Sequence, residues 1–475
     1  MKNSSSGKIL QESLTHKWRN VWESVNEDER EKIFGISEEY KSFLDKGKTE
    51  REAVKEIIRL ATENGYISLE EIIEKGIKPT PGMKIYANNK DKSIVLLVIG
   101  KEKLEKGMHI IGSHVDAPRI DLKQFPLYED ESLALLKTHY YGGIKKYQWV
   151  TLPLALHGVI INEKGEKIDV VIGEDEKDPV FFITDLLPHL AKDQMEKKMS
   201  EGITGEGLNI LIGSIPYKDE DINEKVKLNI LKILNEKYGI KEEDFTTAEF
   251  QVVPAGKSKD VGLDRSMVGG YGQDDRVCAF TSLRAILDVD NPNKTAVALF
   301  VDKEEIGSVG NTSMESKFFE NVVSELINLT EESYSELTVK RALANSSVLS
   351  ADTVGAFDPN YPEVMDKKNS PYIGKGIVLV KYTGSRGKGG CNDANSEYIA
   401  KIRKIFNDNN VVWQMGELGK VDQGGGGTIA YILANYGMDV VDCGVCLLSV
   451  HAPYEIASKA DVYMAYKGYK AFFNA

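Results

Sequence analysis

The stretch Phe300-Val-Asp-Lys-Glu-Glu-Ile-Gly-Ser-Val-Gly310 begins within an apolar run that covers residues 295–301. An apolar run of this length is typical of a strand buried on both faces of a mostly parallel sheet. In open α/β sheets, ligands bind just beyond the carboxyl ends of the strands. Glu304 and Glu305 stand at that position, and adjacent carboxylates repel each other unless a cation, a proton or solvent separates them. The stretch therefore predicts a metal site in which one acid binds the ion and the other accepts a proton from water.

Four further clusters help to decide between this metal site and the simpler alternative, an exposed acidic loop, which is the usual place of an isolated acidic pair. His114 and Asp116 follow a predicted strand at residues 108–111. Imidazole is a common zinc ligand, and a nearby carboxylate often fixes its orientation. The other three clusters end in acids or a histidine at the end of an apolar run or at a glycine-rich bend: Asp274, Asp352 and His451. Their shared chemistry favours the metal site.

Asp274 has a second interpretation. It follows the glycine-rich residues 269–272 and precedes a helix predicted at residues 278–287. An aspartate at this place could cap the helix by accepting a backbone N–H. An acid at such a bend also suits a ligand that bridges two cations, and the sequence alone leaves both interpretations open.

Length and composition limit the classes of function. The chain has 475 residues, with 41% hydrophobic and 28% charged residues, which is ordinary for a globular protein with room for two domains. The net charge of −13 argues against nucleic acid and against an anionic membrane surface as partners. No stretch approaches the roughly 20 apolar residues of a membrane span, and the polar first residues do not resemble a signal peptide. Four cysteines do not make a disulfide framework, so we expect a cytoplasmic protein.

Residues 122–252 differ in character from the rest of the chain. Short alternating strands and an amphipathic helix predicted at residues 226–238 replace the strand-end acids. We interpret this segment as an inserted, mainly β domain for assembly or substrate access. Residues 1–121 and 253–475 would together form the catalytic domain. Burial statistics favour structural or surface roles for the histidines His157 and His189.

The glycine-rich residues 424–427 lack the Gly-Lys-Ser/Thr ending of a phosphate-binding loop. Close approach of the backbone to a substrate is the better interpretation. Upstream of this run, Lys381, Arg386 and Lys388 could bring positive charge to the site, although most such residues are simply solvated.

As a set, these motifs resemble those of the aspartyl aminopeptidase family, which are dinuclear zinc aminopeptidases. The matching segments span nearly the whole chain and are, in order, Ser113-His-Val-Asp-Ala-Pro118, Asp274-Asp-Arg276, Glu304-Glu-Ile-Gly307, Ser350-Ala-Asp352 and His451. The resemblance implies an α/β fold with a mixed, mostly parallel central sheet and helices on both faces, together with the smaller inserted mainly β domain. It also implies a homo-oligomer built from dimers, a dodecamer.

The resemblance further implies two Zn²⁺ ions per subunit, for which Co²⁺ or Mn²⁺ could substitute. Asp274 would bridge the two ions. His114 and Asp352 would complete one metal site, and Glu305 and His451 would complete the other.

Roles in catalysis and substrate binding follow from the same resemblance. Glu304 would act as the general base, and Asp116 would orient the neighbouring histidine. His189, donated by the partner subunit, would stabilise the tetrahedral intermediate. An acidic N-terminal residue of a peptide with a free N-terminus would need a cation, for which Lys381 and Lys388 are candidates.

Asp275, Ala452 and the segment 350–356 depart from the usual family pattern and leave the substrate preference undecided. Three other functions therefore stay open from the sequence. A related dinuclear aminopeptidase could prefer neutral or apolar N-terminal residues. An N-acyl-amino-acid deacylase would act on blocked substrates. A non-catalytic, metal-binding assembly protein would keep the fold, but a structural zinc site favours four Cys or His ligands over carboxylates.

Overall fold

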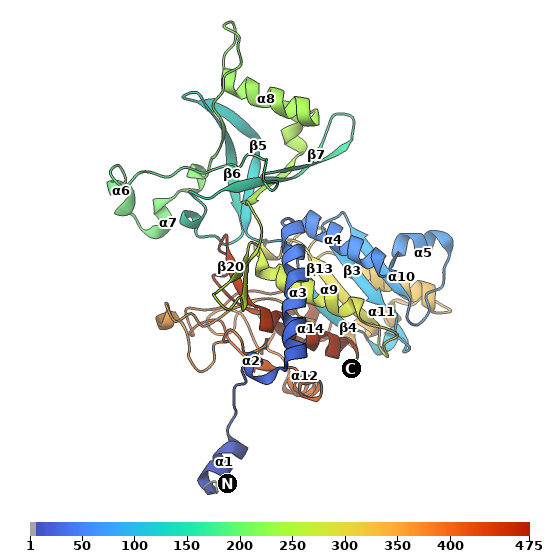
Figure 1. Cartoon of the computed structure of the whole chain (residues 1–475). Coiled ribbons are helices and arrows are strands. Elements are labelled where there is room, and N and C mark those ends of the chain that lie inside the picture. The colour runs from blue at the N-terminus through green and yellow to red at the C-terminus, as the bar shows by residue number, and fades with distance from the viewer. Residues whose placement is uncertain (1–5) are drawn as a thin grey trace.

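The computed structural model describes residues 6–475 and has a larger and a smaller lobe, each with its own sheet (Figure 1). The larger lobe contains a nine-stranded sheet. In sheet order its strands are β1 (Ile67–Ser68), β2 (Lys84–Asn89), β3 (Ser93–Val98), β13 (Ala296–Val301), β4 (His109–His114), β14 (Ser347–Ser350), β18 (Asp439–Gly444), β16 (Ile377–Val380) and β17 (Trp413–Met415). The four strands from β13 to β18 run parallel, whereas β3 and β16 are antiparallel to them. The predicted mixed, mostly parallel sheet is confirmed.

Helices cover both faces of this sheet. Successive residues of β13 belong alternately to two hydrophobic cores, because side chains alternate across a strand. One core is completed by α3 (Glu27–Lys46), α4 (Glu50–Glu63), α9 (Gln273–Leu287), α12 (Ser396–Asp408) and α14 (Lys459–Phe473). The other is completed by α5 (Leu69–Lys75), α10 (Phe318–Thr330), α11 (Glu336–Ala344) and α13 (Ala430–Ala434).

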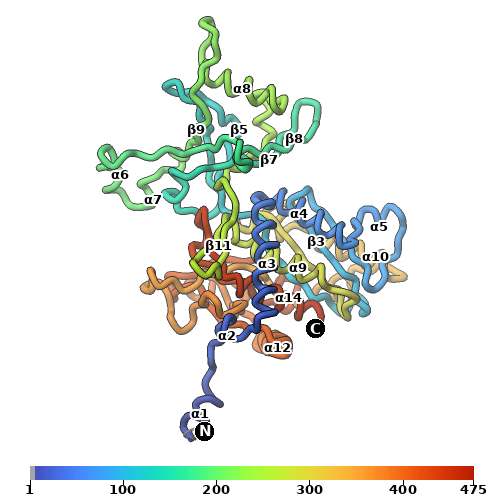
Figure 2. Tube along the Cα trace, viewed as in Figure 1, coloured from blue at the N-terminus to red at the C-terminus, as the bar shows by residue number. Residues whose placement is uncertain are grey.

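The smaller lobe contains an antiparallel six-stranded sheet and stands apart from the larger lobe along the chain trace (Figure 2). In sheet order its strands are β8 (Lys167–Ile172), β7 (Leu154–Ile161), β10 (Glu249–Pro254), β5 (Arg119–Asp130), β6 (Leu133–Tyr141) and β9 (Ile210–Gly213), with α8 (Lys225–Tyr238) packed beside them. In chain order the first of these strands, β5, begins shortly before residue 122, and the last, β10, ends shortly after residue 252. The division into domains at those two residues stays a prediction.

A third sheet of five strands lies beside the candidate site. Its order is β11 (Lys259–Val261), β12 (Met267–Gly270), β20 (Glu455–Ser458), β19 (Cys446–Leu448) and β15 (Val354–Gly355). The apolar run that ends just before His451, at residues 439–450, is divided between β18 and β19. A Cβ atom at Gly444 would lie 1.8 Å from the carbonyl oxygen of Asp352, so the chain needs glycine where it changes sheets.

The remaining α-helices are short: α1 (Ser6–Leu14), α2 (Val21–Ser24), α6 (Lys192–Met195) and α7 (Met199–Gly202). Among residues 6–475, helices are all too short or too polar to cross a membrane.

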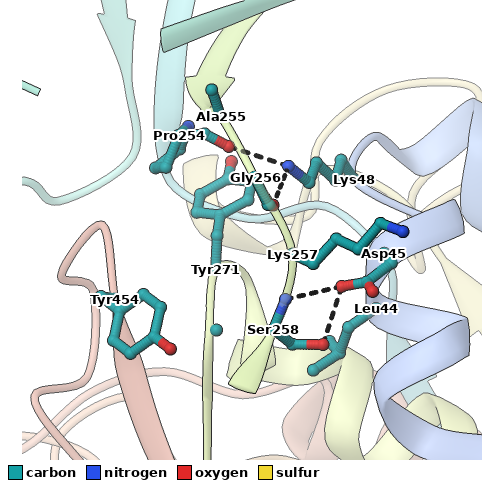
Figure 3. Close-up of a pocket in the computed structure, with 11 residues that line it drawn as sticks. Leu44, Asp45, Lys48, Pro254, Ala255, Gly256, Lys257, Ser258, Tyr271 and Tyr454 are labelled. Carbon is teal, nitrogen blue, oxygen red and sulfur yellow. Dashed lines mark hydrogen bonds between the residues drawn. The ribbon is translucent and has the colours of Figure 1, made fainter. Parts of the chain in front are cut away.

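Hydrogen bonds from the last turn of α3 and from Lys48, just beyond it, hold the segment that returns from the smaller lobe (Figure 3). The Nζ atom of Lys48 donates to the carbonyl oxygens of Pro254 and Gly256, at 2.9 and 2.7 Å. The Asp45 carboxylate accepts from the N–H and the hydroxyl of Ser258, each at 2.7 Å. The cavity between them, about 30 Å³, has room for about one water molecule.

His157 forms a second link between the lobes. Its Nδ1 atom lies 2.8 Å from Glu52, and its Nε2 atom lies 3.1 Å from Glu174. Glu52 also completes a capping box with Thr49 at the start of α4. Burial opposes a charged imidazole, but the hydrogen bonds to Glu174 and Glu52 outweigh burial and raise the pKa of His157. This histidine is therefore structural.

We expect His157→Gln to destabilise the protein more at about pH 6 than at about pH 9. A pKa raised in the folded state contributes stability that is fully present below the unfolded value of about 6.5 and is lost as the pH rises through the folded value. Thermal or urea unfolding should show a loss of about 1–3 kcal/mol at the lower pH. His139→Gln, on an exposed position of β6, is the control. An equal loss at both pH values would argue against a charged His157.

Candidate metal centre

Three neighbouring strands bring four of the sequence-predicted residues to one edge of the nine-stranded sheet. β13, β4 and β14 are adjacent and parallel, and Val301 is in register with His114. Their carboxyl ends therefore meet. His114 ends β4, Glu304 and Glu305 form the short 3₁₀ turn that follows β13, and Asp352 follows β14. These four residues therefore lie at the carboxyl ends of strands, as the sequence predicted.

Asp274 and His451 reach the same place from the five-stranded sheet. Asp274 lies in the first turn of α9, just after β12, and His451 precedes β20, with which β12 pairs. The N-cap residue of α9 is Gly272, which has a φ of +69° and no side chain that could cap the helix. Asp274 instead points at the two histidines, so its geometry matches the bridging interpretation better than the capping one.

Two groups of possible ligand atoms share Asp274, and within each group the atoms lie within 4.8 Å of one another. In the first group, the Nε2 atom of His114 lies 3.5 Å from Oδ1 of Asp274 and 3.8 Å from Oδ1 of Asp352. In the second group, the Nε2 atom of His451 lies 3.2 Å from Oδ2 of Asp274 and 3.4 Å from Oε2 of Glu305. One oxygen of Asp274 thus faces each histidine.

The donor set fits zinc ions, which bind imidazole nitrogen and carboxylate oxygen. Three buried atoms of the set lack a hydrogen-bond partner among residues 6–475: Nε2 of His114, Oδ1 of Asp274 and Oε1 of Glu305. Buried polar atoms without a partner are rare and costly. Burial raises the pKa of Glu305, and the charge of Asp274 adds to this effect. Cations at this place would satisfy the orphaned atoms and relieve the repulsion between the acids.

Asp116 organises the strand ends around it. Its Oδ1 and Oδ2 atoms accept the backbone N–H groups of Glu304 and Glu305, each at 3.2 Å. The Nδ1 atom of His114 lies 3.2 Å from Oδ1 of Asp116 and 3.1 Å from its carbonyl oxygen. The predicted contact between Asp116 and His114 is therefore present, and the carboxylate also holds the backbone of both glutamates.

Two residues that the sequence did not indicate contact this network. The Tyr141 hydroxyl donates to Oδ2 of Asp116 at 2.8 Å. The buried carboxylate of Glu455 accepts the backbone N–H groups of His451 and Asp274, at 2.8 and 3.0 Å. Tyr141 lies in the smaller lobe, where no local pattern marks it. Glu455, four residues after His451, could have been noticed as an acid beside a predicted ligand.

Glu304 lies beside the first group without belonging to it. Its Oε2 atom is 3.9 Å from Nε2 of His114. Burial, opposed by His114 and reinforced by the charges of Asp352 and Asp116, raises the pKa of Glu304 to about 8. Its side chain also lines the adjoining cavity. A carboxylate in this position can accept a proton from water.

A cavity of about 1100 Å³ opens from the acids and His451. Arg386 and Lys388 line it, and Lys388 is held by Asp393 at 2.9 Å. Lys381 and His189 are not among the described residues that line it. Lys381 lies 3.5 Å from Asp393, and His189 is exposed on the segment between β8 and β9. The structure thus brings Arg386 and Lys388 to the cavity and leaves Lys381 and His189 outside it in a single chain.

Comparison with known proteins places the chain in a family. The model of the aminopeptidase I zinc metalloproteases (M18) matches residues 43–473. A relative from Clostridium acetobutylicum, described as "Probable M18 family aminopeptidase 1", is 58% identical over 97% of this chain and 99% of its own length. The crystal structure of an M18 aminopeptidase from Thermotoga maritima is 46% identical, with a TM-score of 0.92 over 97% of this chain and 100% of that one. The structure of an mApe1 dodecamer from S. cerevisiae, 23% identical, shares the fold with a TM-score of 0.75 over 92% of this chain and 96% of that one. The chain therefore belongs to the M18 family of zinc metalloproteases and is an aminopeptidase.

Proposed function

We propose that this aminopeptidase uses two zinc ions per subunit, shared by Asp274, with Glu304 as general base. The observation that carries the proposal is the placement of the two oxygens of Asp274, one near His114 and the other near His451. A single metal ion would need only one of the two groups of ligand atoms, and the acids of the other group would then be buried charges without a partner. His114 and Asp352 would hold one ion, and Glu305 and His451 the other.

The residues of the chain divide the reaction between them. When bound, the two ions supply positive charge that acidifies water and polarises the scissile carbonyl. Glu304 accepts the proton of the attacking water and passes it to the leaving amine. Nearby cations favour the carboxylate form that this role needs, because opposite charges lower the pKa of an acid. Asp116 keeps the backbone of Glu304 in place and orients His114.

We further propose that peptides with an acidic N-terminal residue are preferred. Arg386 and Lys388 line the cavity, as do Lys145 and Lys420, and we propose the first two as the cations that meet a substrate carboxylate. Lys381 and Lys388 both form ion pairs with Asp393, so Lys381 would help to position the loop that carries Lys388. A preference for neutral N-terminal residues is the second candidate, because the cavity is also lined by apolar residues such as Leu418.

We also propose that the enzyme is a homo-oligomer and lies in the cytoplasm. A chain of the same fold has been solved as a dodecamer, and the segment between β8 and β9 exposes several apolar side chains, among them Leu186, Leu187 and Leu190. These observations support a homo-oligomer built from dimers, in which His189 reaches a partner's site. Within residues 6–475, which include all four cysteines, the thiols are free, as expected for a cytoplasmic enzyme.

Asp274→Asn should weaken binding at both metal sites, whereas Asp352→Asn should weaken one. The reason is that Asp274 faces both histidines and Asp352 faces one of them. Elemental analysis of dialysed protein measures the number of zinc ions per subunit. Asp358→Asn, a cavity-lining acid outside both groups, should keep the wild-type number. Loss of only one zinc ion in Asp274→Asn would contradict the proposal that Asp274 binds both ions.

Glu304→Gln should lower kcat for aminoacyl para-nitroanilides by about 10²- to 10⁴-fold while the zinc content stays unchanged. A chelator should abolish release by the wild-type enzyme, and zinc should restore it. Retention of wild-type kcat by Glu304→Gln would exclude Glu304 as the base. Cleavage of N-acylated amino acids in place of free N-termini would instead favour the deacylase.

Arg386→Gln and Lys388→Gln should each lower kcat/KM for aspartyl and glutamyl substrates by about 10- to 100-fold, the loss expected for one hydrogen bond to a charged group. The leucyl substrate should be hardly affected. Lys404→Gln, on the exposed face of α12, is the control. Faster hydrolysis of the leucyl substrate by the wild-type enzyme would overturn the acidic preference and leave the two-zinc mechanism standing.

A further inference from the structure

A three-residue segment of the smaller lobe touches both proposed metal sites. Tyr141, the last residue of β6, donates its hydroxyl to Asp116 at 2.8 Å. Two residues later, the carbonyl oxygen of Gly143 lies 2.9 Å from Nδ1 of His451. The same short segment therefore reaches the first site through Asp116 and the second site through His451.

The contact of Tyr141 acts on more than one element. The Oδ2 atom of Asp116, which accepts the hydrogen bond from Tyr141, also accepts the N–H of Glu305. The Oδ1 atom of Asp116 accepts the N–H of Glu304. Oδ1 also lies next to Nδ1 of His114. A carboxylate that supports this many groups has little freedom to turn, and a fixed hydroxyl donor reduces that freedom further.

The glycines after Tyr141 fit closely against the second site. Gly142 has a φ of +73°, and a Cβ atom there would lie 3.4 Å from Cβ and Oε2 of Glu305. A Cβ atom at Gly143 would lie 3.4 Å from Nδ1 of His451. When the carbonyl of Gly143 accepts the Nδ1 proton of His451, the Nε2 lone pair is left facing Asp274 and Glu305.

The segment is anchored by the sheet of the smaller lobe. Arg119 of β5 pairs with Tyr141 of β6, and its guanidinium lies 3.7 Å from the centre of the tyrosine ring. Arg119 also lies 2.7 Å from Asp121 and 3.6 Å from Glu50 of α4. This buried ion network fixes the tyrosine ring, so a shift of the smaller lobe would move the hydroxyl.

We propose that the segment 141–143 is a positioning element through which the smaller lobe sets the geometry of both metal sites, with Tyr141 as the positioning residue for Asp116. The inference rests on the two-zinc function proposed above. It assigns the smaller lobe a part in metal binding that is separate from any contact with substrate or with another subunit.

The test compares Tyr141→Phe with Tyr140→Phe, a matched change on the neighbouring, exposed tyrosine of the same strand. The ring of Tyr141 and its contact with Arg119 remain in Tyr141→Phe, so thermal unfolding should be nearly unchanged. The affinity for Co²⁺ or Zn²⁺, measured by competition with a chelator, should fall by about 10- to 100-fold. kcat should fall with it while KM stays within about twofold, and the visible spectrum of the Co²⁺ enzyme should change.

Wild-type affinity, spectrum and kcat in Tyr141→Phe would overturn the inference. Asp116→Asn provides a second measurement: if Tyr141 acts through Asp116, adding Tyr141→Phe to Asp116→Asn should cost much less than the two single losses combined. Full additivity would also overturn it. Failure of the proposed function is distinguishable, because it would appear as fewer than two ions in the wild-type enzyme.

Discussion

Repulsion between buried acids is the constraint on which the rest of this structure depends. Asp274, Glu304, Glu305 and Asp352 gather at one edge of the central sheet with two histidines among them. Burial raises the pKa values of both glutamates and of Asp352, so these acids are not stable together as charged groups without compensating positive charge. In the proposed function, two cations held by these residues would supply that charge, and Glu304 would be free to move a proton.

The fold delivers these acids by two independent routes. Adjacent parallel strands place His114, Glu305 and Asp352 at a common edge, as their register requires. The five-stranded sheet brings Asp274 and His451 to face them, and Glu455 ties the backbones of these two residues together. Neither sheet alone contains a complete proposed site. Their relative placement is therefore as important as the ligands themselves.

Much of the central fold could be predicted from the sequence because it depends on local patterns. The apolar run at β13 and the capping box of α4 predict their elements directly, and the strand-end acids predict where a ligand would bind. Contacts between distant segments left no such pattern. Tyr141 meets Asp116 through the pairing of β5 with β6, and the division of the run at residues 439–450 depends on Gly444 passing close to Asp352.

The most direct measurement is a crystal structure of the zinc-loaded enzyme with anomalous diffraction collected at the zinc absorption edge. We expect two anomalous peaks per subunit, one beside Nε2 of His114 and one beside Nε2 of His451, on either side of the Asp274 carboxylate. A single peak, or two peaks that do not share Asp274, would contradict the two-zinc proposal.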